Sequence, residues 1–273
     1  MRFLREYTRI NRKLEAKYFK QILSSLNKVR DELIAFIKVS GIIAAQQRFN
    51  NTLVINGIAE TIKRLYVETG VIHARRNYKE LREQKQFPGL GFSQTWTNNI
   101  LEILRLFLTD KILFTASETT KNELMKVLIK GITEGWGVDK IVSTLETFPG
   151  LKYQAERIVR TEVNRAANLG VSEAGKSFKF EQNKRWISIR DTRTRGANPK
   201  DHANHLLMHG QTVDFNSVFI DPRNGDILYQ PGDPNAKAES TINCRCTMEL
   251  IAKRDERGRL IRKPNSVLQP IQI

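Results

Sequence analysis

Apolar side chains recur every three or four positions along the first part of the chain, and this spacing places them on one face of a helix. One series runs over residues 8–37 and a second over residues 42–81. Gly57 and Gly70 interrupt the second series, and each disfavours helix by about 1 kcal/mol relative to alanine. The pattern predicts that residues 1–87 form a long amphipathic helical hairpin, which either packs as a bundle or serves as a docking region.

The helical pattern resumes after a linker rich in proline and glycine at residues 86–91. Further apolar series predict helices over residues 98–113, 117–132, 138–145 and 153–176. The glycine-rich turn at residues 135–137 gives a helix–turn–helix pattern. The second helix of that pair carries mixed charges, Asp139 and Lys140, so we favour a packing corner over DNA readout. Residues 92–180 are predicted to form a helical domain.

Beyond Phe180 the pattern changes to the alternation that is typical of strands. Strands are predicted over residues 186–189, 211–218, 227–230 and 247–251, with loops rich in proline and glycine between them. We predict a small α+β unit over residues 181–253 and a basic tail over residues 254–273, extended or disordered. The predicted fold class is α+β, with a mostly helical N-terminal two-thirds and a small C-terminal unit that contains an antiparallel sheet.

Charge is the unusual feature of the composition. The chain has 45 Lys and Arg against 29 Asp and Glu, which gives a net charge of +16. Such a field favours polyanionic partners such as nucleic acid, an anionic membrane or an acidic protein face. Charge constrains partners and not fold, so a basic protein without a nucleic-acid partner stays an alternative.

Neither secretion nor membrane insertion is expected from the sequence. The N-terminus lacks the apolar core and small-residue cleavage site of a signal peptide. The most apolar stretch, residues 33–45, is too short to span a bilayer and contains Lys38. The two cysteines, Cys244 and Cys246, are too close in sequence for an unstrained disulfide. We expect reduced thiols in a cytoplasmic setting and no membrane-spanning segment.

The residues with distinctive chemistry gather in the last third of the chain. Cys244 and Cys246 offer thiolates, and His202, His205 and His209 offer imidazoles, which are the ligand types that zinc takes. The Cys-x-Cys spacing departs from the usual Cys-x2-Cys knuckle, and the histidine pair lacks the glutamate of a zinc-protease helix. Buried thiols with histidines bonded to local backbone therefore stay an alternative to a zinc site.

Three further interpretations of this region are open. A cysteine nucleophile could use a histidine base with Asp191 as its orienter, although no nucleophile elbow marks it. A nuclease could use Asp191, His202 and His205, although metal nucleases gather more carboxylates. In the structural interpretation, Asp191 accepts from loop N–H groups while Arg193 and Arg195 fork to carboxylates and make the loop rigid.

A set of short motifs follows in a fixed order between about residues 120 and 250. The motifs are Arg160-Thr161-Glu162, Asn168, Trp186, Asp191, Arg193-Thr194-Arg195, His205, Gly210 and Asn243-Cys244-Arg245-Cys246. In this order they resemble the phage Mu F-like family of minor head proteins, also called phage head morphogenesis proteins. Residues 196–203 look like an insertion, which makes His205 the motif histidine. Thr241-Ile242 stands where many relatives have His or Pro before the cysteines, which weakens the case for a metal.

The resemblance implies a virion component of the phage head that assembles in the bacterial host cytoplasm. It implies the portal protein and the inner capsid shell as partners, and double-stranded DNA bound without sequence preference. It brings no enzymatic activity, and we expect no toxin domain after the family region. The first 85 residues resemble no family that we can name, and they would be the part that varies with the partner and docks on it. The alternatives are a metal-dependent hydrolase or nuclease and a general nucleic-acid-binding protein.

Overall fold

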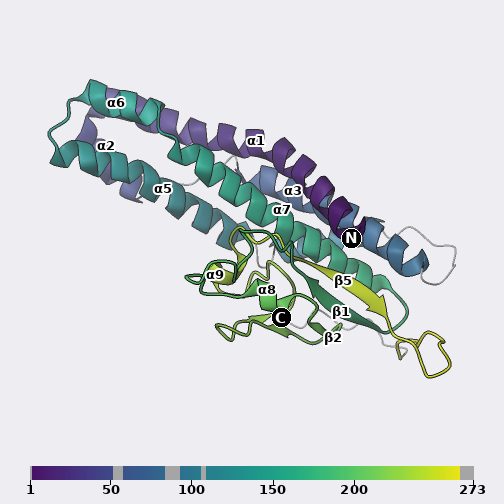
Figure 1. The fold of residues 1–273 in the computed structure, drawn as a ribbon. Coiled ribbons are helices and arrows are strands. Elements are labelled where there is room, and N and C mark those ends of the chain that lie inside the picture. The colour runs from purple at the N-terminus through teal and green to yellow at the C-terminus, as the bar shows by residue number, and fades with distance from the viewer. Residues whose placement is uncertain (1, 52–57, 84–92, 106–108, 265–273) are drawn as a thin grey trace. The chain divides into compact units, whose positions relative to one another are not determined.

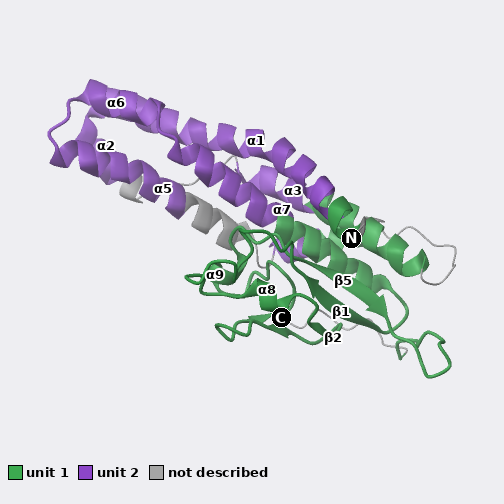
Figure 2. Cartoon of the chain, in the orientation of Figure 1, with its two compact units in different colours: residues 1–6, 67–100, 164–273 green, residues 7–66, 101–163 purple. Residues whose placement is uncertain are grey.

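Two compact units make up the protein in a computed structural model that describes residues 2–51, 58–83, 93–105 and 109–264. Unit 1 comprises Met1–Glu6, Val67–Ile100 and Asn164–Ile273, and unit 2 comprises Tyr7–Tyr66 and Leu101–Val163 (Figure 2). The predicted α+β class is confirmed, because the long helices precede a small antiparallel sheet (Figure 1).

Helices occupy the segments with a predicted apolar series, but the series over residues 42–81 holds two helices and not one. These helices are α1 (Arg2–Ser40), α2 (Ile42–Asn51), α3 (Ile58–Glu83), α4 (Ser93–Ile103), α5 (Thr109–Thr133), α6 (Val138–Glu146) and α7 (Gly150–Ser177). The helix predicted to begin at Ser117 begins at Thr109 instead, because no glycine or proline interrupts the segment between them. The series over residues 98–113 is divided between α4 and α5.

Unit 2 is built from apolar stripes on its helices. Tyr18, Ile22 and Leu26 of α1 are buried at four-residue spacing, as the sequence pattern requires. In the same unit α2 packs against α5, and α5 packs against α6. None of the described helices has both the length and the apolar character that a bilayer span needs.

In unit 1 an antiparallel sheet packs on helices. Its strand order is β2-β1-β5, with β1 at Gln182–Ile187, β2 at Thr212–Asp214 and β5 at Thr247–Ala252. Met248 and Leu250 of β5 share a buried cluster with Val171 of α7 and Leu81 of α3. This packing fixes the sheet against the helices and leaves the loops between the strands to form the site.

The remaining elements of unit 1 are short. They are β3 (Phe219–Ile220), β4 (Ile227–Leu228), α8 (His205–Met208) and α9 (Ala238–Thr241), and β3 pairs only with β4. The strand predicted over residues 186–189 was wrong at both ends, since β1 begins at Gln182 and ends at Ile187, and Arg190 takes a positive φ of 64°. Isolated bridges join Arg254 to Leu260 and Phe180 to Arg262, while residues 265–273 of the predicted tail lie outside the described part.

Helices α3 and α7 meet at two glycines within unit 1. A Cβ on Gly170 would lie 2.1 Å from the carbonyl oxygen of Gly70, so only glycine allows the two backbones to approach so closely. Gly70 was counted against a helix in the sequence pattern, and this crossing explains its presence in α3.

Candidate functional site

Sheet register brings the site together. Trp186 and Ile187 at the end of β1 pair with Met248 and Thr247 at the start of β5, so the Cys244–Cys246 turn lies directly beyond the sheet. Asn243 opens that turn with a positive φ of 59°. His205 begins α8, whose N-cap Asn204 accepts from the backbone N–H of Leu207 at 3.1 Å.

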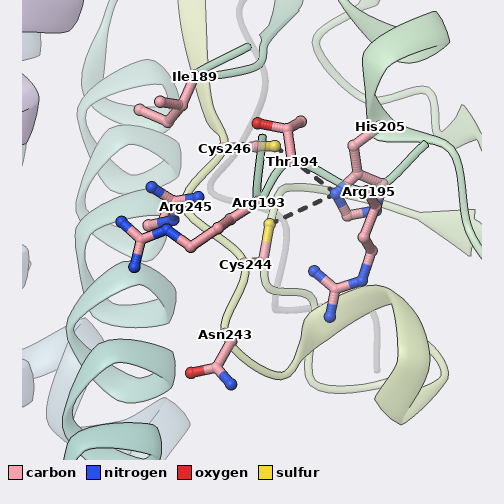
Figure 3. Close-up of a pocket in the computed structure, with 9 residues that line it drawn as sticks. All are labelled: Ile189, Arg193, Thr194, Arg195, His205, Asn243, Cys244, Arg245 and Cys246. Atoms are coloured by element: carbon pink, nitrogen blue, oxygen red, sulfur yellow. Dashed lines mark hydrogen bonds between the residues drawn. The ribbon is translucent and has the colours of Figure 1, made fainter. Parts of the chain in front are cut away.

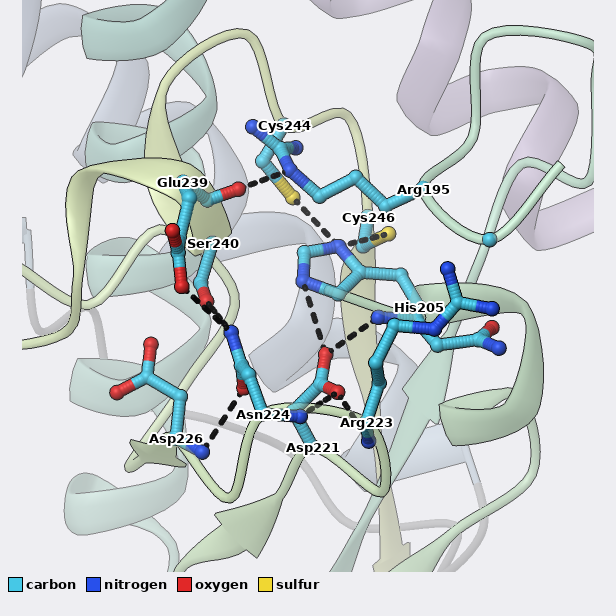
Figure 4. Close-up of polar contacts among 12 residues, drawn as sticks. Arg195, His205, Asp221, Arg223, Asn224, Asp226, Glu239, Ser240, Cys244 and Cys246 are labelled. Atoms are coloured by element: carbon cyan, nitrogen blue, oxygen red, sulfur yellow. Dashed lines mark hydrogen bonds and ion pairs between the residues drawn. The ribbon is translucent and has the colours of Figure 1, made fainter. Parts of the chain in front are cut away.

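The imidazole of His205 lies between two thiols and a carboxylate. Its Nδ1 is 3.6 Å from Sγ of Cys244 and 3.6 Å from Sγ of Cys246 (Figure 3). On the opposite side of the ring, Nε2 lies 3.9 Å from Oδ2 of Asp221 (Figure 4). All four residues are buried, with His205 at 1% and Asp221 at 0% exposure.

The position of the His205 ring is fixed from several sides. Ser188 Oγ donates to the His205 carbonyl oxygen, and the Trp186 ring stands edge-on to the imidazole with centroids 5.2 Å apart. Asp221 is held in turn, because its Oδ2 accepts from the Asn204 backbone N–H at 2.8 Å and its Oδ1 from the Arg223 backbone N–H at 2.8 Å. The ring and the carboxylate are therefore preorganised relative to each other.

The two thiols have opposite protonation tendencies. A hydrogen bond from Cys246, together with His205 and Arg195, holds the pKa of Cys244 well below its usual range. The same hydrogen bond and burial raise the pKa of Cys246. The pair thus favours one thiolate beside one thiol.

Asp191 belongs to a separate ion pair beside this cluster. Its two carboxylate oxygens accept from Arg245 at 2.6 and 2.7 Å, and Oδ1 also accepts from the Arg193 backbone N–H and the Thr194 hydroxyl at 3.1 Å. The hydrogen bonds from Arg245 hold the pKa of Asp191 well below its usual range. Arg195 instead donates to the carbonyl oxygens of Glu239 and Ile242 at the end of α9.

Two more of the predicted residues support the cluster through backbone contacts. Asn168 of α7 donates through Nδ2 to the Cys246 carbonyl oxygen at 3.1 Å. Gly210 has a φ of 86° and donates its N–H to the Trp186 carbonyl oxygen at 2.9 Å. Both contacts hold the ends of the site in place.

The rest of the predicted residues do not join the thiols. Arg160, Thr161 and Glu162 belong to unit 2, where buried Glu162 accepts from the Tyr66 hydroxyl at 2.6 Å. His202 is exposed, and Nδ1 of exposed His209 accepts from the Ser188 backbone N–H at 3.1 Å.

Sequence reasoning missed Asp221. It treated Asp221 as part of a proline- and glycine-containing loop and assigned Asp191 as the partner of a histidine. Nothing in the local pattern distinguishes an aspartate that shapes a turn from one that also faces an imidazole 16 positions earlier in the chain.

The space beside the thiols limits what the cluster can do. The hollow lined by Thr194, Arg195, His205 and the two cysteines has a volume of about 10 Å³, which is room for one water molecule. A thiol, an imidazole and a carboxylate in that order could form a nucleophilic relay, but a substrate would need a cavity many times larger. His205, Cys244 and Cys246 also form a group whose ligand atoms all lie within 4.8 Å of one another.

Comparison with known proteins gives one family match. Residues 122–249 match the model of the family described as phage Mu protein F like protein. The matched segment contains every residue of the cluster, from Asn168 to Cys246. Comparison with curated proteins and with solved structures gave no match.

Proposed function

Through residues 122–249 the chain belongs to the phage Mu protein F-like family, and we propose that it is a minor head protein that docks on the portal and contacts packaged DNA. Membership of the family indicates a role in phage head morphogenesis and is the observation that carries the proposal. The proposed location is the phage head, after assembly in the host cytoplasm.

The buried cluster supports a structural role for the family region. Its polar groups bond to one another and to loop backbone, and the hollow beside them has room for about one water molecule. Loops that are tied down in this way give a rigid unit with little regular secondary structure.

DNA contact is supported by one side of α1. Arg9, Arg12, Lys13, Lys17, Lys20 and Lys28 are exposed along this helix. Their spacing keeps them on one side, and the 19 helical rises from Arg9 to Lys28 cover about 28 Å, which is shorter than the roughly 34 Å turn of B-form DNA. We call these six residues the basic face. Regularly placed cations of this kind bind phosphates without reading bases.

Portal docking is assigned to the apolar end of unit 2. Val39 at the end of α1 is 87% exposed and Ile43 at the start of α2 is 66% exposed. Ile129, Ile132 and Val138 are also exposed on α5 and α6 of the same unit. Figure 1 shows the ends of these helices gathered together. Exposed apolar side chains at the ends of packed helices suit a protein partner.

The test is co-expression with the portal protein from the same phage genome, followed by affinity capture of the portal and mass spectrometry. Wild-type protein is expected at a fixed ratio to portal. The double variant Val39→Asp, Ile43→Asp should no longer be recovered with the portal protein. Leu207→Asp with Ile227→Asp is the matched control, since these exposed side chains lie in unit 1 and should leave recovery intact. Absence of the folded wild-type protein from captured portal would overturn the docking proposal.

A further inference from the structure

Both distances from the His205 imidazole to the two thiols, Cys244 and Cys246, fit a tetrahedral zinc site. Tetrahedral bonds of about 2.3 Å to sulfur and about 2.0 Å to nitrogen place a sulfur and a nitrogen ligand about 3.5 Å apart. Both observed separations between Nδ1 and Sγ are 3.6 Å. Both sulfur atoms point toward the same ring nitrogen of His205, as Figure 3 shows.

The other ring nitrogen of His205 supplies an independent observation. Nε2 is buried without a hydrogen-bond partner, and the fully buried Oδ2 of Asp221 lies 3.9 Å from it (Figure 4). A histidine that binds metal through one nitrogen characteristically directs its other N–H toward a carboxylate, which orients the ring.

We propose that His205 Nδ1, Cys244 Sγ and Cys246 Sγ bind one zinc ion, with Asp221 orienting the histidine and a water in the adjacent hollow as fourth ligand. Zinc binding would displace the proton of the remaining thiol to solvent, and the two thiolates would then neutralise the charge of Zn²⁺. Soft sulfur ligands favour zinc over magnesium or calcium. The hollow of about 10 Å³ has room for the water.

The ion would add a further link between segments that contain little regular secondary structure. His205 lies on α8 and the cysteines lie before β5, and the intervening chain contains only short strands and α9. The apolar cluster around Trp186, Met208 and Phe219 is small and includes both cysteines. Metal binding would therefore add to the stability of the loops around β1 and β5. This inference is independent of portal or DNA binding.

The first test measures zinc in the full-length protein without a histidine tag, purified with a thiol reductant and dialysed against micromolar zinc. Elemental analysis should find one zinc ion per chain. Cobalt substitution should give the thiolate charge-transfer band and the intense d–d bands of a tetrahedral site. A folded wild-type protein that retains no zinc, and whose two thiols react freely with a thiol reagent in the native state, would overturn the proposal.

Variants then assign the ligands. Cys244→Ser and Cys246→Ser should each lose the bound zinc and the cobalt charge-transfer intensity, whereas His202→Gln, a nearby exposed histidine, should keep both. Asp221→Asn should keep one zinc ion per chain with an affinity about 10–100-fold lower. If a double serine variant that still folds binds as much zinc as the wild type, the ion is held elsewhere and the assignment is wrong.

Discussion

At the scale of single residues, Arg245 shows how much depends on side-chain geometry. Its guanidinium forks to both oxygens of Asp191, and lysine cannot reproduce this planar pair of hydrogen bonds. Arg245→Lys should therefore lower the free energy of unfolding by about 1 kcal/mol. Arg185→Lys is the control, because Arg185 meets Glu249 through a single half-exposed contact and its loss should be under about 0.5 kcal/mol. Urea denaturation of both variants measures the difference, and equal losses would contradict it.

His73 gives a pH-dependent prediction on the same scale. Burial, with a smaller effect of Arg76, lowers the pKa of His73 from 6.5 to about 3. As pH falls, His73 is therefore protonated in the unfolded chain at a higher pH than in the folded protein. The folded state loses stability as pH falls from about 6.5 toward 3. Between pH 7 and pH 4.5 the loss from this group should be about 2 kcal/mol.

The measurement for His73 is thermal unfolding at the two pH values. His73→Gln should show a smaller drop in Tm between pH 7 and pH 4.5 than the wild type. His202→Gln changes an exposed histidine and should keep the wild-type drop. An unchanged drop in the His73→Gln variant would exclude His73 as a source of acid sensitivity.

At the scale of elements, the crossing of α3 and α7 is the most sensitive contact. Gly170→Ala adds a methyl group against the Gly70 carbonyl, which is backbone and cannot rotate away. The gain in helix propensity of about 1 kcal/mol is outweighed by overpacking, and we expect a net loss of about 2 kcal/mol. Gly137→Ala is the control, because a Cβ there meets nothing within 4 Å and its φ is −68°. Chemical denaturation that ranks Gly137→Ala as the more damaging change would contradict this.

Elements with a strong period could be predicted from the sequence, and elements without one could not. The buried residues of α1 repeat over many turns, and β5 carries enough alternating residues to be recognised. β3 consists of Phe219–Ile220 alone, and two residues define no period. The sequence predicted only those site residues whose side chains have distinctive chemistry. The cysteines were chosen for their ligand type and His205 for its place in the family motif, whereas Asp221 reaches His205 through a turn that the sequence pattern does not specify.

At the scale of the whole molecule, the net charge of +16 makes attraction to DNA depend strongly on salt. If total charge alone determined DNA affinity, removing any lysine would have the same effect as removing any other. The proposed basic face makes a different prediction, because only cations that contact phosphates release counterions on binding. The position of a lysine should then matter more than its charge.

Two triple variants with the same change in charge separate these cases. The first variant replaces Lys13, Lys17 and Lys20 of the basic face with glutamine. The second variant replaces Lys79, Lys126 and Lys130 with glutamine, and each of these lysines lies beside a glutamate. Binding to a duplex of mixed sequence is measured by fluorescence anisotropy over a range of salt concentrations. The first triple should reduce the slope of log K against log salt by about 3, since each lost phosphate contact removes about 0.9. The second should bind close to the wild type. Equal effects of the two triple variants would show that net charge, and not the basic face, drives DNA binding. If the wild-type protein has no measurable affinity for DNA at low salt, DNA contact is removed from the proposed function. Portal docking is tested separately and is unaffected by this result.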